Sequence, residues 1–263
     1  MPTMLTDRPP GNTSLLRSFL ESDQLTSLAV PQDDLLSALA RSVDSTMKQG
    51  RSTLVHQACT ELLTAAAELY KVQRPTVRVL AARPLRVREG GGATELFGDY
   101  SPGAMLIRVW MRTAVRKQVT SFGTFLSTLC HEFCHHLDYQ RFGFRDSWHT
   151  RGFYERTAVL YHHVRGTPMK RLFWLRAPGG RWRIDWPRTN RGLGGVKREA
   201  PWSFLRQHFS KGTPRLRSRF VSGHGFSRAR LACGEQFRAP QPKRCAISVW
   251  RETERAWRCP RSC

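Results

Sequence analysis

A five-residue motif, His131-Glu132-Phe133-Cys134-His135, constrains this chain of 263 residues more than any other feature. It lies in a stretch where large apolar residues recur at three- and four-residue steps, which is the period of a helix. Residues four positions apart on a helix lie on the same face, one turn apart. The sequence therefore predicts that His131 and His135 project from one face, close enough to bind one metal ion.

The pattern His-Glu-x-x-His on a helix is typical of zinc-dependent peptide hydrolysis. Imidazole nitrogens bind zinc well, and a catalytic zinc site has three protein ligands and leaves a fourth position to water. Glu132, next to the first histidine, is placed to act on zinc-bound water as a general base. The motif predicts a zinc metalloprotease with Zn²⁺ as its cofactor, Glu132 as the catalytic residue, and His131 and His135 as metal ligands.

The third ligand has two candidates in the sequence. His149 lies ahead of the next expected helix, and Glu155 lies inside that helix. A scheme in which Gly and His follow the second ligand at three and six residues is excluded, because Asp138 and Arg141 hold those positions. The spacing alone leaves His149 and Glu155 open.

Residues 129–156, LCHEFCHHLDYQRFGFRDSWHTRGFYER, resemble the SprT-like zinc metalloprotease family. In that family a short motif helix is followed, after about a dozen residues, by a histidine, a small residue and an aromatic anchor, which here are His149, Thr150 and Phe153. The similarity covers residues 50–165, and Thr150 stands where the family often has glycine. The resemblance implies zinc bound by His131, His135 and His149, with Glu132 as general base and acid.

The order of expected elements indicates an α+β fold. Helical periodicity covers residues 33–50 and 52–73, period-two alternation indicates short strands at 77–79, 85–87, 94–97 and 104–110, and helices follow at 120–143 and 150–166. With the resemblance, this order predicts a small zincin-like metalloprotease domain over residues 31–175. Residues 1–30 are expected to form a flexible N-terminal segment.

Charge separates this domain from the rest of the chain. Residues 1–165 hold 20 Lys and Arg against 15 Asp and Glu, whereas residues 166–263 hold 23 against 5. The second region also loses periodicity and is interrupted by Gly and Pro. We therefore expect residues 176–263 to form a basic, largely disordered tail that attracts nucleic acid, and the resemblance suggests DNA-associated proteins as substrates.

Cellular context follows from what the sequence lacks. No basic start followed by an apolar run precedes the domain, no window is apolar enough to span a membrane, and seven cysteines are too few for a disulfide scaffold. We expect a cytoplasmic protein with reduced thiols, acting on a protein or peptide substrate without a membrane partner. Two alternatives stay open: a DNA-associated binding protein with a structural metal site, and a zinc hydrolase acting on something other than peptides.

Several neighbouring residues have less specific roles. Asp138 and Asp146 are candidate hydrogen-bond acceptors for the ligating histidines, and Cys134 is expected to pack beneath the motif helix. Residues 104–110 form either a central strand or a sheet edge on which an extended peptide could pair. The remaining histidines near the motif are expected to be surface or packing residues, namely His136, His162 and His163.

Overall fold

The computed structural model describes residues 4–87, 93–192 and 245–250, with only the backbone for residues 86, 87, 93 and 245–250. The chain divides into one compact unit, Met1–Gly192 with Pro242–Cys263, and a second unit, Leu193–Gln241. The second unit lies outside the described residues. Most of the tail that we expect to be disordered therefore lies outside them too.

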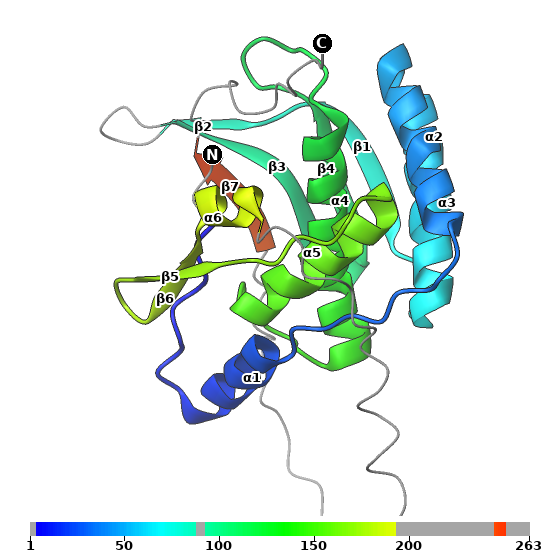
Figure 1. The fold of residues 1–263 in the computed structure, drawn as a ribbon. Coiled ribbons are helices and arrows are strands. Elements are labelled where there is room, and N and C mark those ends of the chain that lie inside the picture. The colour runs from blue at the N-terminus through cyan, green and yellow to red at the C-terminus, as the bar shows by residue number, and fades with distance from the viewer. Residues whose placement is uncertain (1–3, 88–92, 193–244, 251–263) are drawn as a thin grey trace, which may run out of the picture. The chain divides into compact units, whose positions relative to one another are not determined.

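The described residues form an α+β fold, in agreement with the prediction (Figure 1). Its helices are α1 (Thr13–Gln24), α2 (Leu35–Gln49), α3 (Ser52–Tyr70), α4 (Phe122–Leu137), α5 (Arg151–Arg165) and α6 (Trp186–Arg191), with short helical segments η1 (Pro102–Ala104) and η2 (Asp138–Phe142). Its strands are β1 (Thr76–Ala82), β2 (Leu85–Val87), β3 (Ala93–Ser101), β4 (Leu106–Arg112), β5 (Trp174–Ala177), β6 (Arg181–Ile184) and β7 (Cys245–Trp250).

The main sheet has the strand order β1-β4-β3-β2, with β7 also paired to β3. Strand β4 runs parallel to β1 and antiparallel to β3, and Asp99 of β3 stands opposite Arg108 of β4. Strand β4 is therefore a central strand, and of the two uses left open for residues 104–110 the sheet edge is wrong. Backbone pairing on both sides leaves β4 no free edge on which a peptide could add.

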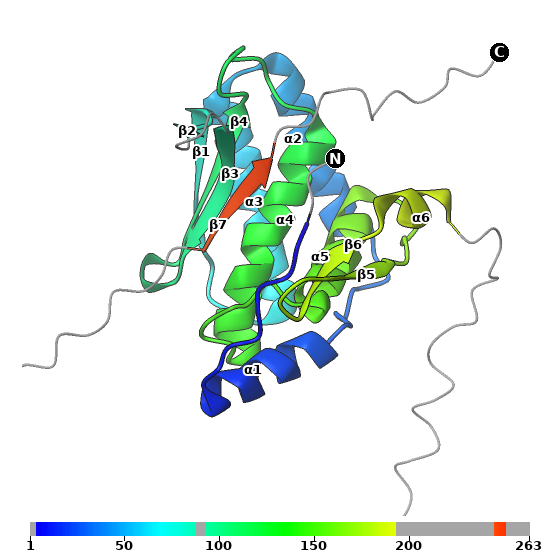
Figure 2. The same ribbon diagram turned by 90° about the vertical axis from the view of Figure 1, so that its left-hand side faces the viewer.

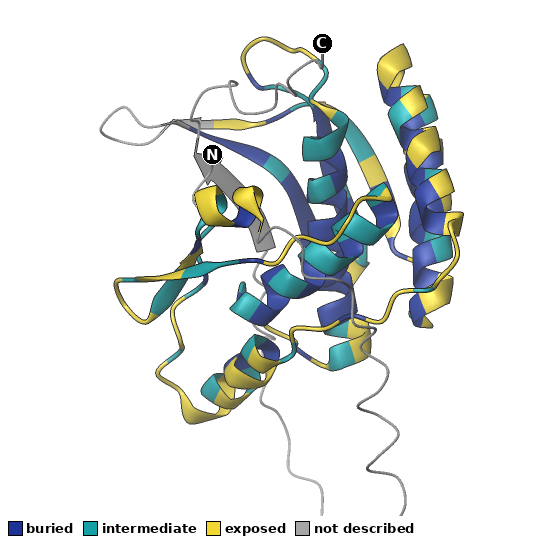
Figure 3. Cartoon of the chain, in the orientation of Figure 1, coloured by how far each residue is buried: buried dark blue, intermediate teal, exposed yellow. Residues whose placement is uncertain are grey.

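The motif helix α4 is the centre of the core. It packs against β3, β4 and α5, and in Figure 2 the sheet stands on one side of α4 while α5 stands on the other. Twelve of its sixteen residues are buried, and Figure 3 shows the helix dark along most of its length. Residues of α4 are therefore held on all sides by packing, which gives side chains on this helix little positional freedom.

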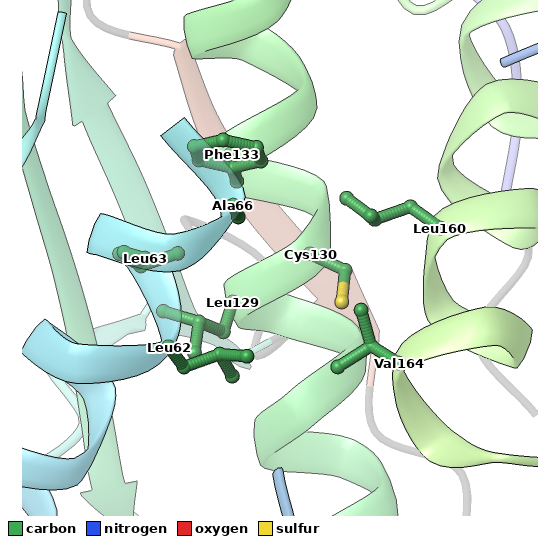
Figure 4. A pocket seen from close by; sticks show the side chains of 8 residues that line it. All are labelled: Leu62, Leu63, Ala66, Leu129, Cys130, Phe133, Leu160 and Val164. Atoms are coloured by element: carbon green, nitrogen blue, oxygen red, sulfur yellow. The ribbon is translucent and has the colours of Figure 1, made fainter. Parts of the chain in front are cut away.

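The apolar contact between α4 and its neighbouring helices includes the buried free thiol of Cys130. This thiol borders a small void between α3, α4 and α5 (Figure 4), lined by Leu62, Leu63, Ala66, Leu129, Cys130, Phe133, Leu160 and Val164. Cys134 is likewise buried and free, as expected for a cysteine that packs beneath the helix. The two motif-region cysteines therefore act as small core residues.

The N-terminal segment differs from the flexible segment that we expect over residues 1–30. Helix α1 begins after Asn12, whose side chain accepts hydrogen bonds from the backbone N–H groups of Ser14 and Leu15 at 2.9 and 3.2 Å. At its other end, the buried Arg156 of α5 donates hydrogen bonds to the carbonyls of Ser22 and Leu25. Long-range contacts thus order a segment whose prolines and glycine suggest flexibility.

The boundary of the folded region also differs from the expected one at residue 175. Strands β5 and β6 form a hairpin, helix α6 follows, and all three belong to the same compact unit as the motif helix. Leu5 pairs with Arg183 of β6, so the start of the chain stabilises this hairpin. No helix in the described part of the chain combines the length and the apolar character needed to cross a membrane.

Candidate metal centre

Helix α4 carries the motif in the register that the sequence predicts. Ser121 caps the helix by accepting a hydrogen bond from the Thr124 N–H at 3.3 Å, and the helical path continues through η2 to Gly143 with φ +73°. His131, Glu132 and His135 are all buried on α4. The two histidines and the glutamate are therefore fixed by one rigid element.

The structure brings His131, His135 and His149 together. The Nε2 atom of His131 lies 3.0 Å from Nε2 of His149 and 3.1 Å from Nε2 of His135, and their candidate ligand atoms all lie within 4.8 Å of one another. Nitrogens bound tetrahedrally to one zinc ion at ~2.05 Å are separated by about 3.3 Å. The two distances from His131 are close to this value, and the three histidines could hold one metal ion.

His149 reaches the cluster from the loop between η2 and α5. Thr150 follows it as the N-cap of α5, because its Oγ1 accepts the Phe153 N–H at 3.1 Å and also bonds the Ser22 hydroxyl at 3.0 Å. A glycine at position 150 would lack both contacts. Phe153 is fully buried, and its ring lies 4.5 Å from that of His135 and 5.2 Å from that of His149. Phe153 thus packs against the rings of His135 and His149, at the position expected for the aromatic anchor.

The ring of His135 is held by a chain of polar contacts. Its Nδ1 lies 2.7 Å from Ser147 Oγ, which donates a hydrogen bond to Asp138 at 2.9 Å. Because that hydroxyl proton is directed at Asp138, the His135 Nδ1–H donates to Ser147, and the Nε2 lone pair faces the cluster. Asp138 is also paired with the buried Arg156 at 2.8 Å. Asp138 is therefore an acceptor near the site, as predicted, but it acts through Ser147.

An acceptor for the ring of His149 comes from Asp7, near the start of the chain. Its Nδ1 lies 3.3 Å from Asp7 Oδ2, and the same carboxylate accepts the His149 backbone N–H at 2.9 Å. Burial would raise the pKa of Asp7, but the hydrogen bonds and charge of His149 bring it below its ordinary value. Asp7 lies on the side of the ring opposite Nε2, so it orients this histidine without entering the ligand cluster.

Glu132 is a fully buried carboxyl group whose two oxygens accept no hydrogen bond from any residue that the structure describes. Burial, and secondarily the charge of Asp99, raises the pKa of Glu132 well above its ordinary value. An isolated buried carboxylate is costly unless a positive charge lies close by. The orphaned carboxyl of Glu132 therefore fits a site built for a cation and a water molecule.

Gly98 of β3 makes room for this carboxyl group. A Cβ atom on Gly98 would lie 2.9 Å from Glu132 Oε1 and 2.6 Å from Thr128 Cγ2, closer than Cβ contacts in real proteins. Any larger residue at this point of the strand would force Glu132 or Thr128 to shift. The backbone of β3 thus forms the wall against which Glu132 lies.

The protonation state of the buried histidines suits metal binding. Burial, with the neighbouring histidines as a second cause, lowers the pKa of His131 and His135 well below the ordinary value of 6.5. Both imidazoles are therefore neutral near pH 7, which is the form that binds a metal ion.

The other candidate ligand lies outside the cluster. Glu155 accepts a hydrogen bond from Trp174 Nε1 at 3.0 Å and is absent from the group of residues whose ligand atoms converge. His136 bonds the Gln73 carbonyl at 2.7 Å and the Tyr100 hydroxyl at 2.9 Å, so it is a packing residue, as predicted. Of the two candidates left open by spacing, the geometry favours His149.

Three residues of the site, Asp7, Gly98 and Ser147, are absent from the sequence predictions. Gly98 left a signal, because an isolated glycine inside a strand pattern indicates a close approach by other atoms. Asp7 has no such signal in the sequence, since its partner lies 142 residues away.

Searches against protein-family models, curated proteins and solved structures found no match to this chain.

Proposed function

We propose that the chain is a zinc-dependent metallopeptidase of the SprT-like type. The observation that carries the proposal is the convergence of three imidazoles beside a buried carboxyl group that accepts no hydrogen bond from the described residues. Three histidines would hold the ion, which supplies Lewis acidity toward a carbonyl oxygen and a water molecule. A donor set of three imidazole nitrogens fits zinc.

Residues of the chain itself transfer the proton and orient the ligands. Glu132 accepts a proton from the attacking water and returns it to the leaving amine, which requires a carboxyl group free of competing hydrogen bonds. Gly98 keeps the space for this carboxyl, and Ser147 with Asp138 keeps the His135 Nε2 lone pair directed at the ion. Asp7 orients the ring of His149 in a similar way.

A catalytic role is favoured over a structural one by the number of ligands. Structural zinc sites are closed by four protein ligands and are often rich in cysteine. In the described part of the chain, the convergent group contains three histidines, and the cysteines of α4 are buried in the apolar core. The site therefore leaves a coordination position for water, as hydrolysis requires.

The experiment that tests this proposal is the substitution Glu132→Gln. The amide cannot accept and return a proton, so we expect peptide cleavage to fall by ~10²–10⁴-fold while one zinc per chain is retained. Cleavage of a denatured protein substrate and metal content are measured on the same samples. Retained proteolysis would contradict the role of Glu132, and cleavage of small esters or amides but no protein would favour the non-peptide hydrolase.

Binding to nucleic acid is a second candidate function, supported by the basic stretch that begins near residue 166. Its described part, residues 166–192, holds seven Lys and Arg and one Asp, and Arg176 and Arg188 stack on the rings of Trp182 and Phe173 at 5.2 and 4.2 Å. Such a surface attracts phosphates. Salt-dependent retention of the Glu132→Gln chain on DNA would support this function, and elution independent of DNA and salt would contradict it.

A further inference from the structure

Residues 4–7 run along β6 of the β5–β6 hairpin, with an isolated antiparallel bridge between Leu5 and Arg183. Thr6 donates its N–H to the Trp182 carbonyl at 2.8 Å and accepts the Trp182 N–H on its hydroxyl at 2.8 Å. The Ile184 N–H also donates to the Met4 carbonyl at 3.2 Å, and Thr6 is buried. The start of the chain is therefore anchored on β6 before it reaches the ligand cluster.

Asp7, the next residue, is tied to His149 three times. The Asp7 N–H donates to the His149 carbonyl at 2.9 Å, the His149 N–H donates to Asp7 Oδ2 at 2.9 Å, and Oδ2 lies 3.3 Å from His149 Nδ1. Tyr154, which stacks on the His149 ring at 5.9 Å, donates its hydroxyl to the Leu5 carbonyl at 3.4 Å. Both the backbone and the ring of His149 thus depend on this segment.

His149 needs such support more than the other two ligands do. His131 and His135 are fixed by the hydrogen bonds of α4 and by packing on all sides, whereas His149 lies in a loop and its side chain is 18% exposed. A loop histidine can rotate about two side-chain bonds and can expose either ring nitrogen. An acceptor at Nδ1 removes both freedoms, because it retains the proton there and leaves the Nε2 lone pair toward His131.

We propose that Asp7 is the positioning residue of the third ligand, and that residues 4–7 are thereby an integral part of the metal centre. The inference rests on the proposed zinc site but is independent of peptide hydrolysis. Because binding couplings are reciprocal, zinc must strengthen the docking of residues 4–7 by the same factor by which their docking strengthens zinc binding. The start of the chain and the metal then stabilise each other.

The test measures zinc affinity of the full-length chain by competition with a chromophoric chelator. Loss of an outer hydrogen-bond partner of a ligand weakens metal binding ~10–100-fold, so we expect a weakening in that range for Asp7→Ala. Asp7→Asn keeps an acceptor oxygen without the charge and should lie between wild type and Asp7→Ala. In hydrogen exchange, zinc should slow the Thr6 and Asp7 amides of wild type, and this effect should shrink in Asp7→Ala.

Asp23→Ala is the matched control. Asp23 accepts the Arg151 backbone N–H at 2.9 Å and pairs with its guanidinium, so it also links the N-terminal region to the start of α5, but it contacts no ligand. If Asp7 acted only by general stabilisation, Asp23→Ala would weaken zinc binding to the same extent. We expect its zinc affinity to stay within about twofold of wild type, with urea unfolding of each variant confirming that it is folded.

The outcomes separate this inference from the peptidase proposal. Weakened zinc binding in Asp7→Ala alone supports the positioning role, whether or not any variant cleaves peptides. Equal zinc affinity in wild type and Asp7→Ala, or equal weakening in Asp23→Ala, would overturn it. A wild-type chain that binds no zinc would overturn both proposals.

Discussion

Helix α4 and the loop that carries His149 bring histidines to the same candidate metal site in different ways. On α4, the distance between His131 and His135 follows from the helical repeat, and burial on every side fixes their rings. His149 reaches the same cluster because Asp7, 142 residues away in the sequence, holds its backbone and ring. Local spacing therefore places two of the candidate ligands, and tertiary contacts place the third.

The substitution His149→Ala should have the largest effect on zinc binding. It removes one of three ligand nitrogens, so zinc affinity should fall by more than the ~10–100-fold expected for an outer partner such as Asp7. Metal analysis after dialysis measures the loss.

Glu155→Ala is the matched comparison, because Glu155 bonds Trp174 and lies outside the cluster. This variant should retain zinc. Loss of zinc in Glu155→Ala with retention in His149→Ala would reverse the ligand assignment.

The substitution Gly98→Ala tests whether β3 must leave space for the Glu132 carboxyl group beside α4. The new Cβ would overlap with Glu132 and Thr128, which should displace the carboxyl group and lower peptide cleavage by about 10²-fold. Zinc should be retained, since no ligand contacts Gly98 in the described part of the chain. Gly103→Ala serves as the control because a Cβ there meets nothing within 4 Å, and equal activity losses in the two variants would contradict the role of Gly98.

The buried histidines of α4 predict a pH dependence of stability. Because burial lowers the pKa of His131 and His135 below 6.5, the unfolded chain binds protons that the folded chain does not as pH falls below that value. The contribution of these two histidines to the free energy of unfolding of the metal-free protein should therefore decrease toward acid, by up to about 1.4 kcal/mol per pH unit for each histidine. Burial raises the pKa of Glu132 and Asp138, so these two carboxyl groups contribute in the opposite sense.

Urea unfolding at pH 7.5 and 5.5 measures this dependence. His131→Gln should reduce the slope, because one of the two titrating groups is gone. Because Glu132 and Asp138 are present in both proteins, the difference between the two slopes isolates the imidazole, and an unchanged slope in His131→Gln would contradict the burial of a neutral His131.

The same contrast explains how much could be predicted from the sequence. The caps and ends of α4 and α5, the α+β order and the ligand pair on α4 all follow from patterns within about fifteen residues, such as Ser121 and Thr150 at helix starts. The bridge between Leu5 and β6 and the central position of β4 depend on pairing between distant segments. No local pattern records such pairing.

Helix α1 is an intermediate case. Asn12 followed by the apolar spacing of Leu15, Phe19 and Leu20 is a helix signal, yet the prolines nearby favour a flexible reading of the same residues. The deciding contact comes from Arg156, whose guanidinium bonds carbonyls at the end of α1 and the carboxylate of Asp138. That contact exists only once α5 has docked, so tertiary structure decides the outcome.

The most direct test of three imidazoles on one zinc ion is X-ray absorption spectroscopy at the zinc edge of the full-length protein. We predict one zinc per chain with three imidazole nitrogens and one oxygen ligand, at about 2.0–2.1 Å. In His149→Ala the remaining signal should lose one imidazole. Sulfur at about 2.3 Å, as from Cys130 or Cys134, or only two imidazoles in the wild-type protein, would contradict the account.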